Sequence, residues 1–259
     1  MPGSSPITGD TVRDDFNAIS AVIHYARAAH FLGLWESERL LVTRHFPDRA
    51  ARLLEAGCGA GRVSVGLWHL GYRRVTGFDF AAEMIDQAQN LAQEQGITDL
   101  SFVVADATKL ADSQSPVLHP QPGFDGVLFL FNGLMQIPGR ENRRAAMRSL
   151  YAACRPGGTF IFTTHDREDP REQKAWADEA ARWARGEQNP RLREFGDRYF
   201  VHEHGATFMH LPDKKEVIAD LLATGWRFEH SILRDDLATE RMAVREFSDN
   251  CRFWVAKKS

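Results

Sequence analysis

The chain has 259 residues, of which 43% are hydrophobic and 26% charged, and its formal net charge is -3. Because proteins that bind nucleic acid usually carry an excess of Lys and Arg, this balance disfavours nucleic acid as the main partner. Three distant cysteines (Cys58, Cys154, Cys251), no secretory signal and no apolar run of about 18 residues predict a cytoplasmic protein with free thiols and no membrane partner.

The N-terminal region is predicted to be helical. After ten residues rich in Pro, Gly and Ser, apolar residues recur with helical spacing from residue 10 to about 46. Gly33 divides this stretch into two expected helices, and Pro47 ends it. We expect residues 1–50 to form an N-terminal helical cap.

Short strands and helices alternate from residue 51 onward. This alternation predicts an α/β fold with a doubly wound, mostly parallel sheet. The nearly all-apolar "FDGVLFLF" is typical of a central strand covered on both faces. The first five strands are expected at 51–56, 73–80, 100–107, 124–131 and 158–166, with helices at 62–70, 81–96 and 142–154.

The alternation breaks at residues 165–212, a charged segment containing Trp176 and Trp183. We expect a lid-like insertion there, made of one helix and one or two strands. A helix follows at 212–225, with Asp213 and Glu216 as a capping box. Strands at 226–233 and 251–258 complete seven, so residues 51–259 are predicted to form one domain.

The loop after the first strand, "EAGCGAG", predicts a cofactor site. Its glycines let the backbone turn tightly and approach a ligand. Their G-x-G-x-G spacing differs from the G-x-G-x-x-G of dinucleotide-binding loops. Glu55 would repel a pyrophosphate and attract an ammonium group. The loop therefore favours a ligand with a cationic amino-acid end over NAD.

Two carboxylates at the next strand ends suit an adenosine. Asp79 can accept hydrogen bonds from both ribose hydroxyls. Asp106 suits the exocyclic amine of adenine, with the Ala107 amide facing a ring nitrogen. Ligands of open α/β sheets bind at these strand ends. S-adenosylmethionine combines adenosine, a cationic sulfonium and an amino acid without phosphate.

The chain resembles the class I S-adenosylmethionine-dependent methyltransferases in five ordered motifs: "LLEAGCGAG", "VTGFDFAAEMIDQA", "FVVADATKL", "FDGVLFLFNGLMQI" and "LYAACRPGGTFIF". The resemblance implies a seventh strand inserted antiparallel between the fifth and sixth, and S-adenosylhomocysteine as product. It implies that Glu55 and Gly57 hold the methionine amino end, and that the Phe131–Asn132 backbone lies beside the transferred methyl. The expected cofactor-binding residues are Glu55, Gly57, Cys58, Gly59, Gly61, Asp79, Phe80, Asp106, Ala107, Phe131 and Asn132.

The methyl acceptor is expected to be a small molecule with an O, N or S nucleophile. The fourth-strand motif "FNGLMQIPG" lacks the Pro-Pro-aromatic sequence that follows Asn or Asp in enzymes methylating exocyclic amines of bases. Two alternatives stay open: a methyltransferase for RNA or protein, and a protein that binds S-adenosylmethionine without turnover. The sequence leaves open a monomer or a homodimer.

Candidate acceptor-side residues come from the N-terminal helices, the loop after the fourth strand and the insertion. His165, at the end of the fifth strand, is the candidate general base because histidine titrates near neutral pH. The pattern His202-Glu203-His204 with His210 lacks an evident fourth ligand, so no metal site is expected. The remaining substrate candidates are Tyr25, His30, Trp35, Met135, Gln136, His202 and His204.

Overall fold

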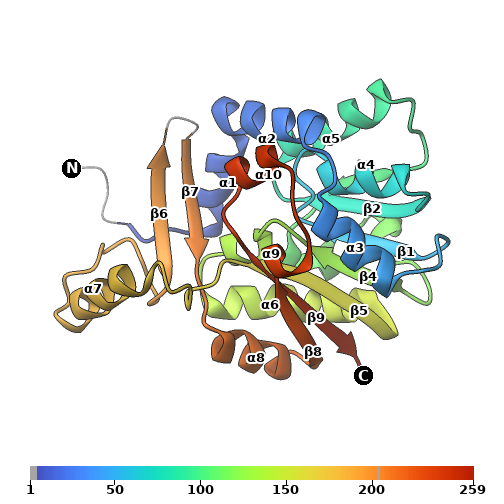
Figure 1. Cartoon of the computed structure of the whole chain (residues 1–259). Coiled ribbons are helices and arrows are strands. Elements are labelled where there is room, and N and C mark those ends of the chain that lie inside the picture. Colours follow the sequence, from blue (N-terminus) through green and yellow to red (C-terminus); the bar gives the residue numbers. More distant parts are fainter. Residues whose placement is uncertain (1–4, 203–204) are drawn as a thin grey trace.

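The computed structural model describes residues 5–202 and 205–259 and is built around a seven-stranded sheet (Figure 1). Its strand order is β3-β2-β1-β4-β5-β9-β8. The strands are β1 (Arg52–Ala56), β2 (Arg74–Asp79), β3 (Ser101–Val104), β4 (Phe124–Phe129), β5 (Cys154–Thr164), β8 (Trp226–Leu233) and β9 (Arg252–Lys258). Within this sheet only β9 runs antiparallel to its neighbours, between β5 and β8. The predicted fold class and the predicted antiparallel place of the last strand are therefore confirmed.

Helices cover both faces of the sheet because its central strands are apolar on both sides. Leu53 of β1 packs with α3 and α4, whereas its neighbour Leu54 packs with α6 and α8 on the opposite face. Figure 1 shows these two layers above and below the sheet. The helices are α3 (Glu36–His45), α4 (Arg62–His69), α5 (Ala82–Glu94), α6 (Arg140–Ala153) and α8 (Lys214–Ala223).

The N-terminal cap contains three helices instead of the two expected. They are α1 (Gly9–Asn17), α2 (Ile19–Phe31) and α3. The extra break lies at Ala18, whose ψ of 135° is extended. The neighbouring Asn17 uses its side-chain oxygen to accept the Glu83 N–H from α5. The apolar spacing gives no sign of this break, and the contact with Glu83 joins residues far apart in the sequence.

Several short elements follow strand ends and escaped prediction because they are too short to show a period. The 3-10 turns are η1 (Ala107–Asp112), η2 (Pro116–Leu118) and η3 (Gly133–Gln136). Two short helices, α9 (Arg234–Leu237) and α10 (Met242–Phe247), lie between β8 and β9. No helix in residues 5–202 and 205–259 has the length and apolar character of a membrane span. All three cysteines are buried free thiols.

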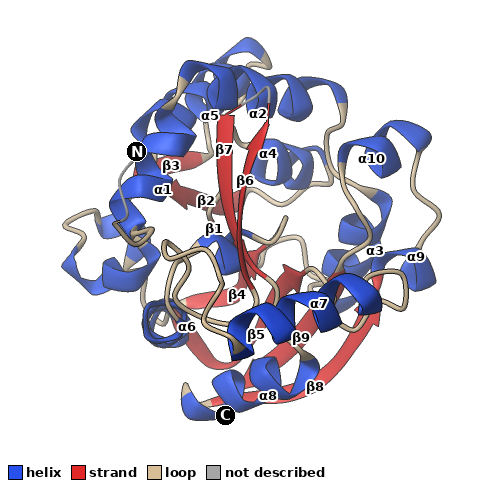
Figure 2. Cartoon of the chain, turned by 90° about the vertical axis from the view of Figure 1, so that its left-hand side faces the viewer, coloured by secondary structure: helices blue, strands red, loops and turns tan. Residues whose placement is uncertain are grey.

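The insertion after β5 forms one helix and one hairpin, as expected. The helix is α7 (Gln173–Ala184), and the hairpin pairs β6 (Asp197–His202) with β7 (Gly205–His210) in an antiparallel sheet of its own. Figure 2 shows the hairpin running from the region of α7 to the N-terminal helices. There Phe208 of β7 packs with Ile7 and with Val12 of α1.

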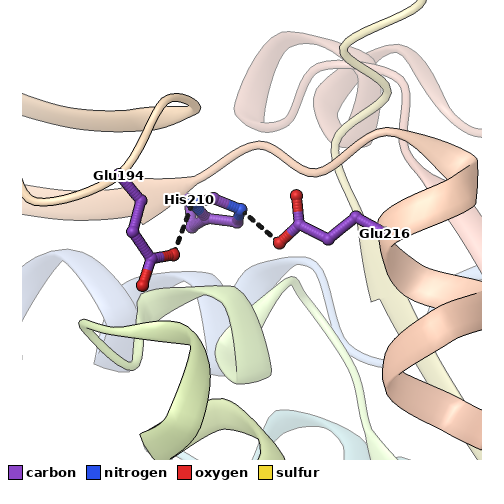
Figure 3. Close-up of side chains that lie close together, drawn as sticks. All are labelled: Glu194, His210 and Glu216. Atoms are coloured by element: carbon purple, nitrogen blue, oxygen red, sulfur yellow. Dashed lines mark hydrogen bonds and ion pairs between the residues drawn. The ribbon is translucent and has the colours of Figure 1, made fainter. Parts of the chain in front are cut away.

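A buried network of charges fixes the base of this hairpin (Figure 3). His210 of β7 donates to Asp197 and to Glu216 of α8, at 2.8 Å each. The buried Arg143 of α6 donates to Glu194 at 2.6 Å. Glu216 therefore turns to His210, and of the expected capping box only the Asp213 half forms. Glu194, His210 and Glu216 approach one another as metal ligands would, but Arg143 already supplies positive charge, so we interpret the set as an ion-pair network.

We predict that this network makes stability depend on pH. Burial alone would lower the pKa of His210, but its hydrogen bonds to Asp197 and Glu216 more than offset burial and raise it. The stabilisation is then complete below the ordinary pKa of about 6.5 and is lost as pH rises through the raised value. In urea unfolding, the wild type should exceed His210→Gln by about 2 kcal/mol near pH 6, with a shrinking margin toward pH 9. A difference that stays constant with pH would contradict this assignment.

Candidate active site

A cavity of about 310 Å³ lies at the carboxyl ends of β1, β2 and β4. Its walls come from α1, α2, the loop after β1, the ends of β2 and β3, η1, the segment from β4 to α6, and α10. None of the described residues of the insertion lines it. The predicted site residues that do line it are Tyr25, Glu55, Gly57, Cys58, Gly59, Asp79, Phe80, Asp106, Ala107, Phe131 and Gln136.

The glycine loop adopts the left-handed backbone that its composition predicts. Gly57, Gly59 and Gly61 have φ values of 61°, 50° and 82°. Gly57 and Gly59 face the cavity, whereas Gly61 faces α5, where an added Cβ would lie 3.0 Å from that of Ala88. The Cys58 side chain is buried, and burial raises its thiol pKa well above the ordinary value. Cys58 is therefore an uncharged packing residue of the cavity wall.

Glu55 is a buried carboxyl at the floor of the cavity. It is 3% exposed and accepts a 2.5 Å hydrogen bond from the Ser64 hydroxyl of α4. Burial raises its pKa to about 8, against the lowering effect of Ser64 and Arg62. Burial disfavours the charged form of Glu55. A cation bound beside the carboxyl would stabilise that charged form and so favour ionisation.

Asp79 and Asp106 are each oriented by hydrogen bonds from their own loops. Asp79 accepts the N–H groups of Gly59 and Ala81, at 2.9 Å each, so the glycine loop and the end of β2 are joined. Burial raises the pKa of Asp79. Asp106 Oδ1 accepts both the N–H and the hydroxyl of Thr108 at 2.8 Å. In the described part of the chain no hydrogen bond occupies Asp106 Oδ2.

Backbone strain marks the turn after β4. Phe131 and Asn132 have φ values of 52° and 60°, which non-glycine residues rarely adopt and which cost of order 1–3 kcal/mol each. The Asn132 N–H donates to Thr163 Oγ1 at 2.7 Å and holds the turn against β5. The Phe131 ring lines the cavity, but Asn132 does not. The side chain of Asn132 is buried, and its Oδ1 has no hydrogen-bond partner.

His165 lies outside the cavity lining. Its Nε2 is 3.1 Å from the Asn132 side-chain nitrogen, and the ring also bonds the Asn250 backbone. Burial lowers its pKa. With both contacts made, His165 joins the turn after β4 to the chain before β9. Its role as a general base stays a prediction, and this geometry does not favour it.

The other acceptor-side candidates divide into two groups. Tyr25 and Gln136 line the cavity together and hydrogen-bond each other, and burial raises the pKa of Tyr25 to about 12. Trp35 and Met135 are buried outside the lining, and His30 is a surface residue bonded to Glu94. The side chain of His202 and the whole of His204 lie outside the described residues.

Many cavity residues were missed, among them Arg62, Phe16 and Phe247. Arg62, directly after the glycine loop, pairs with both oxygens of Glu38 at 2.7 and 2.6 Å. Phe16 of α1 and Phe247 of α10 supply aromatic walls. Phe247 stacks on Phe131 with ring centroids 5.6 Å apart. Arg62 could have been suspected from its place beside the loop, whereas no sequence signal pointed to the two phenylalanines.

Comparison with known proteins finds similarity to methyltransferases over part of the chain. Residues 53–158 match the family described as a methyltransferase domain. The tRNA 5-carboxymethoxyuridine methyltransferase of Escherichia coli is 26% identical over 128 residues, which are 49% of this chain and 44% of that protein. The malonyl-[acyl-carrier protein] O-methyltransferase of Pseudescherichia vulneris is 31% identical over 131 residues, 50% of this chain and 45% of that protein. The matched part is thus less than half the length of either relative.

A solved structure extends the likeness across the fold. The 1,6-didemethyltoxoflavin-N1-methyltransferase of Burkholderia thailandensis, solved with 1,6-didemethyltoxoflavin and S-adenosylhomocysteine bound, has a TM-score of 0.56. It is 18% identical and covers 93% of this chain and 88% of its own. At this identity the likeness concerns the fold alone. Together with the family match, it confirms the resemblance to class I methyltransferases.

We predict that Glu55 costs the ligand-free protein stability at high pH. An acid whose pKa is raised on folding to about 8 destabilises the folded state progressively as pH rises from its ordinary 4.5 toward that value. In urea unfolding, Glu55→Gln should match the wild type at pH 5 and exceed it at pH 9 by on the order of 3 kcal/mol. The same replacement at the exposed Glu172 is the matched control. A variant less stable than the wild type at pH 9 would disprove the assignment.

Proposed function

Since residues 53–158 belong to a family of methyltransferase domains, we propose that this chain transfers a methyl group from S-adenosylmethionine to a small-molecule acceptor. S-adenosylhomocysteine would be the product. The observation that carries the proposal is that one enclosed cavity joins the glycine loop, two strand-end carboxylates and an aromatic chamber. Donor and acceptor would therefore meet in a single space.

The chemistry of the cavity fits a cationic adenosyl donor. Four carboxyls line it: Asp10, Glu55, Asp79 and Asp106. Two of its cations are paired within the protein, Arg62 with Glu38 and Arg13 with Asp10 at 2.8 Å. Glu55 would hold the amino group, Asp79 the ribose hydroxyls and Asp106 the adenine amine. The donor supplies a methyl group already activated on a sulfonium.

The proposed acceptor end has aromatic walls, and the cavity volume of about 310 Å³ favours a small molecule. Tyr25, Phe131 and Phe247 lie on one side of the glycine loop, with centroid separations of 6.2 Å for Tyr25–Phe131 and 5.6 Å for Phe131–Phe247. Helices α2 and α10 supply walls at this end. A flat or apolar acceptor would be desolvated and held against the donor, which is most of what a methyl transfer requires.

Tyr25 is assigned an orienting role. With its pKa raised to about 12 by burial, the hydroxyl stays protonated near neutral pH. It would hydrogen-bond the acceptor together with Gln136 and would not remove a proton. An acceptor with a free lone pair or an acidic nucleophile then fits better than one that needs a strong base.

The proposal also covers the cellular compartment, the oligomeric state and the alternative classes of acceptor. We place the reaction in the cytoplasm, where the three buried free thiols would remain reduced, and the active unit is a monomer or a homodimer. The relatives named above are a tRNA 5-carboxymethoxyuridine methyltransferase and a malonyl-[acyl-carrier protein] O-methyltransferase, so the likeness to them leaves the acceptor open. The enclosed chamber argues for a small molecule.

Calorimetry tests the donor assignment. S-adenosylhomocysteine should bind with 1:1 stoichiometry, and NAD should not bind. Asp79→Asn should weaken binding at least tenfold, because hydrogen bonds between the ribose and a charged carboxylate are lost. Asp112→Asn, the same change at an exposed carboxylate of η1, should leave affinity unchanged. Equal affinity in the Asp79 variant would refute the ribose assignment.

A label-partition experiment tests the acceptor class. The enzyme is incubated with methyl-labelled S-adenosylmethionine and a cell extract separated into small-molecule, RNA and protein fractions. The label should enter the small-molecule fraction and should be absent with Asp79→Asn. Label in RNA or protein would favour that alternative. Donor binding without label in any fraction would favour a protein without turnover.

A further inference from the structure

The helix that covers the donor half of the cavity is short and needs external support. Five residues of α1 line the cavity: Gly9, Asp10, Val12, Arg13 and Phe16. They lie against the end of β2, where the Phe16 and Phe80 ring centroids are 6.2 Å apart and Arg13 is 5.9 Å from the Phe80 ring. Helices of nine residues are marginal in water by themselves, so the position of α1 depends on what packs against it.

The inserted hairpin supplies part of that support from behind. Phe208 of β7 packs on Ile7 and Val12, and the Ile7 N–H donates to the Arg191 carbonyl at 3.1 Å. The Tyr199 hydroxyl of β6 donates to Asp15 Oδ2 on α1 at 2.9 Å. Tyr199 and Phe208 are register partners, so both contacts come from one rung of the hairpin.

The opposite end of the hairpin is fixed to the core. His210 and Asp197 pair across its base, and the network with Glu216 and Arg143 ties them to α8 and α6. The Arg191 guanidinium lies 4.6 Å from the Tyr199 ring and restricts it further. The hairpin therefore links α1, a helix of marginal stability, to a base that is fixed to α6 and α8.

We propose that Tyr199 is a positioning residue: through Asp15 it holds α1 closed over the adenosyl half of the donor and so limits how fast donor and product exchange. The inference rests on the proposed function, because it requires an adenosyl ligand under α1. It assigns the insertion a role that needs no contact with the acceptor. The hairpin secures the helix that forms the lid.

Two measurements on Tyr199→Phe, which removes only the hydroxyl, test the proposal. Stopped-flow fluorescence should show S-adenosylhomocysteine leaving about tenfold faster, as expected for losing one hydrogen bond to a carboxylate. Hydrogen exchange of the ligand-free protein should accelerate in residues 9–17 and stay unchanged in β6, β7 and the central sheet. Tyr151→Phe, which removes a hydroxyl on α6, is the matched control and should change neither quantity.

A second variant distinguishes loss of the Tyr199–Asp15 contact from a general loss of folding. Asp15→Ala breaks the same contact from the α1 side, and the double variant should release the ligand no faster than either single variant. Additive effects, unchanged release and exchange, or faster exchange throughout the hairpin and sheet would each overturn the proposal. If the wild type does not bind S-adenosylhomocysteine but exchange still accelerates only in α1, the proposed function fails and the positioning role of Tyr199 stands.

Discussion

The candidate site depends on the parallel pairing of β1 with its two neighbours. Glu55 lies opposite Gly77 of β2 and Leu128 of β4. This register brings the ends of three strands to one edge, so that the glycine loop, Asp79 and the strained turn at Phe131 meet there. A shift of one residue in either ladder would turn Glu55 to the other face of the sheet. The apolar burial of β1 and β4 on both faces holds the register, so the core and the site have one origin.

The same edge contains the features that cost the most stability. There are three such features at this edge. They are the buried carboxyl of Glu55, the left-handed backbone at Phe131 and Asn132, and the buried Asn132 Oδ1, which accepts no hydrogen bond from a described residue. Each is unfavourable in the ligand-free protein. Unfavourable conformations of this kind persist when contacts with the surrounding structure hold the residues in place. Here that constraint comes from the hydrogen bond that Asn132 donates to Thr163 and from those that Ser64 and Gly59 donate to Glu55 and Asp79. The concentration of strain next to an acidic cavity supports a binding role for this edge.

The sequence indicated which strand-end residues meet at the cavity because their placement depends on local features. Glu55, Asp79 and Asp106 each follow their own strand, and a parallel sheet places strand ends together without further information. The acceptor half is assembled from helices far apart in sequence. Phe247 comes from a segment without periodicity, and His165 was expected in the cavity only because it follows β5. In the structure its ring is bonded to Asn132 and Asn250, a contact that no spacing rule reveals.

The two halves of the cavity are anchored by separate parts of the structure. The donor half is held by strand register and short loops, which tolerate little change. Helices α2 and α10 line the proposed acceptor half, whereas α1 lies over the donor half near Phe80. Glu240 accepts the N–H groups of Glu36 and Ser37, while Val244 packs on Trp35, so the segment bearing Phe247 is tied to the cap. The inserted hairpin supports α1 in the same manner. Changes in these supports would move the aromatic walls while Glu55, Asp79 and Asp106 stayed in place, so the shape of the chamber depends on residues that never contact the acceptor.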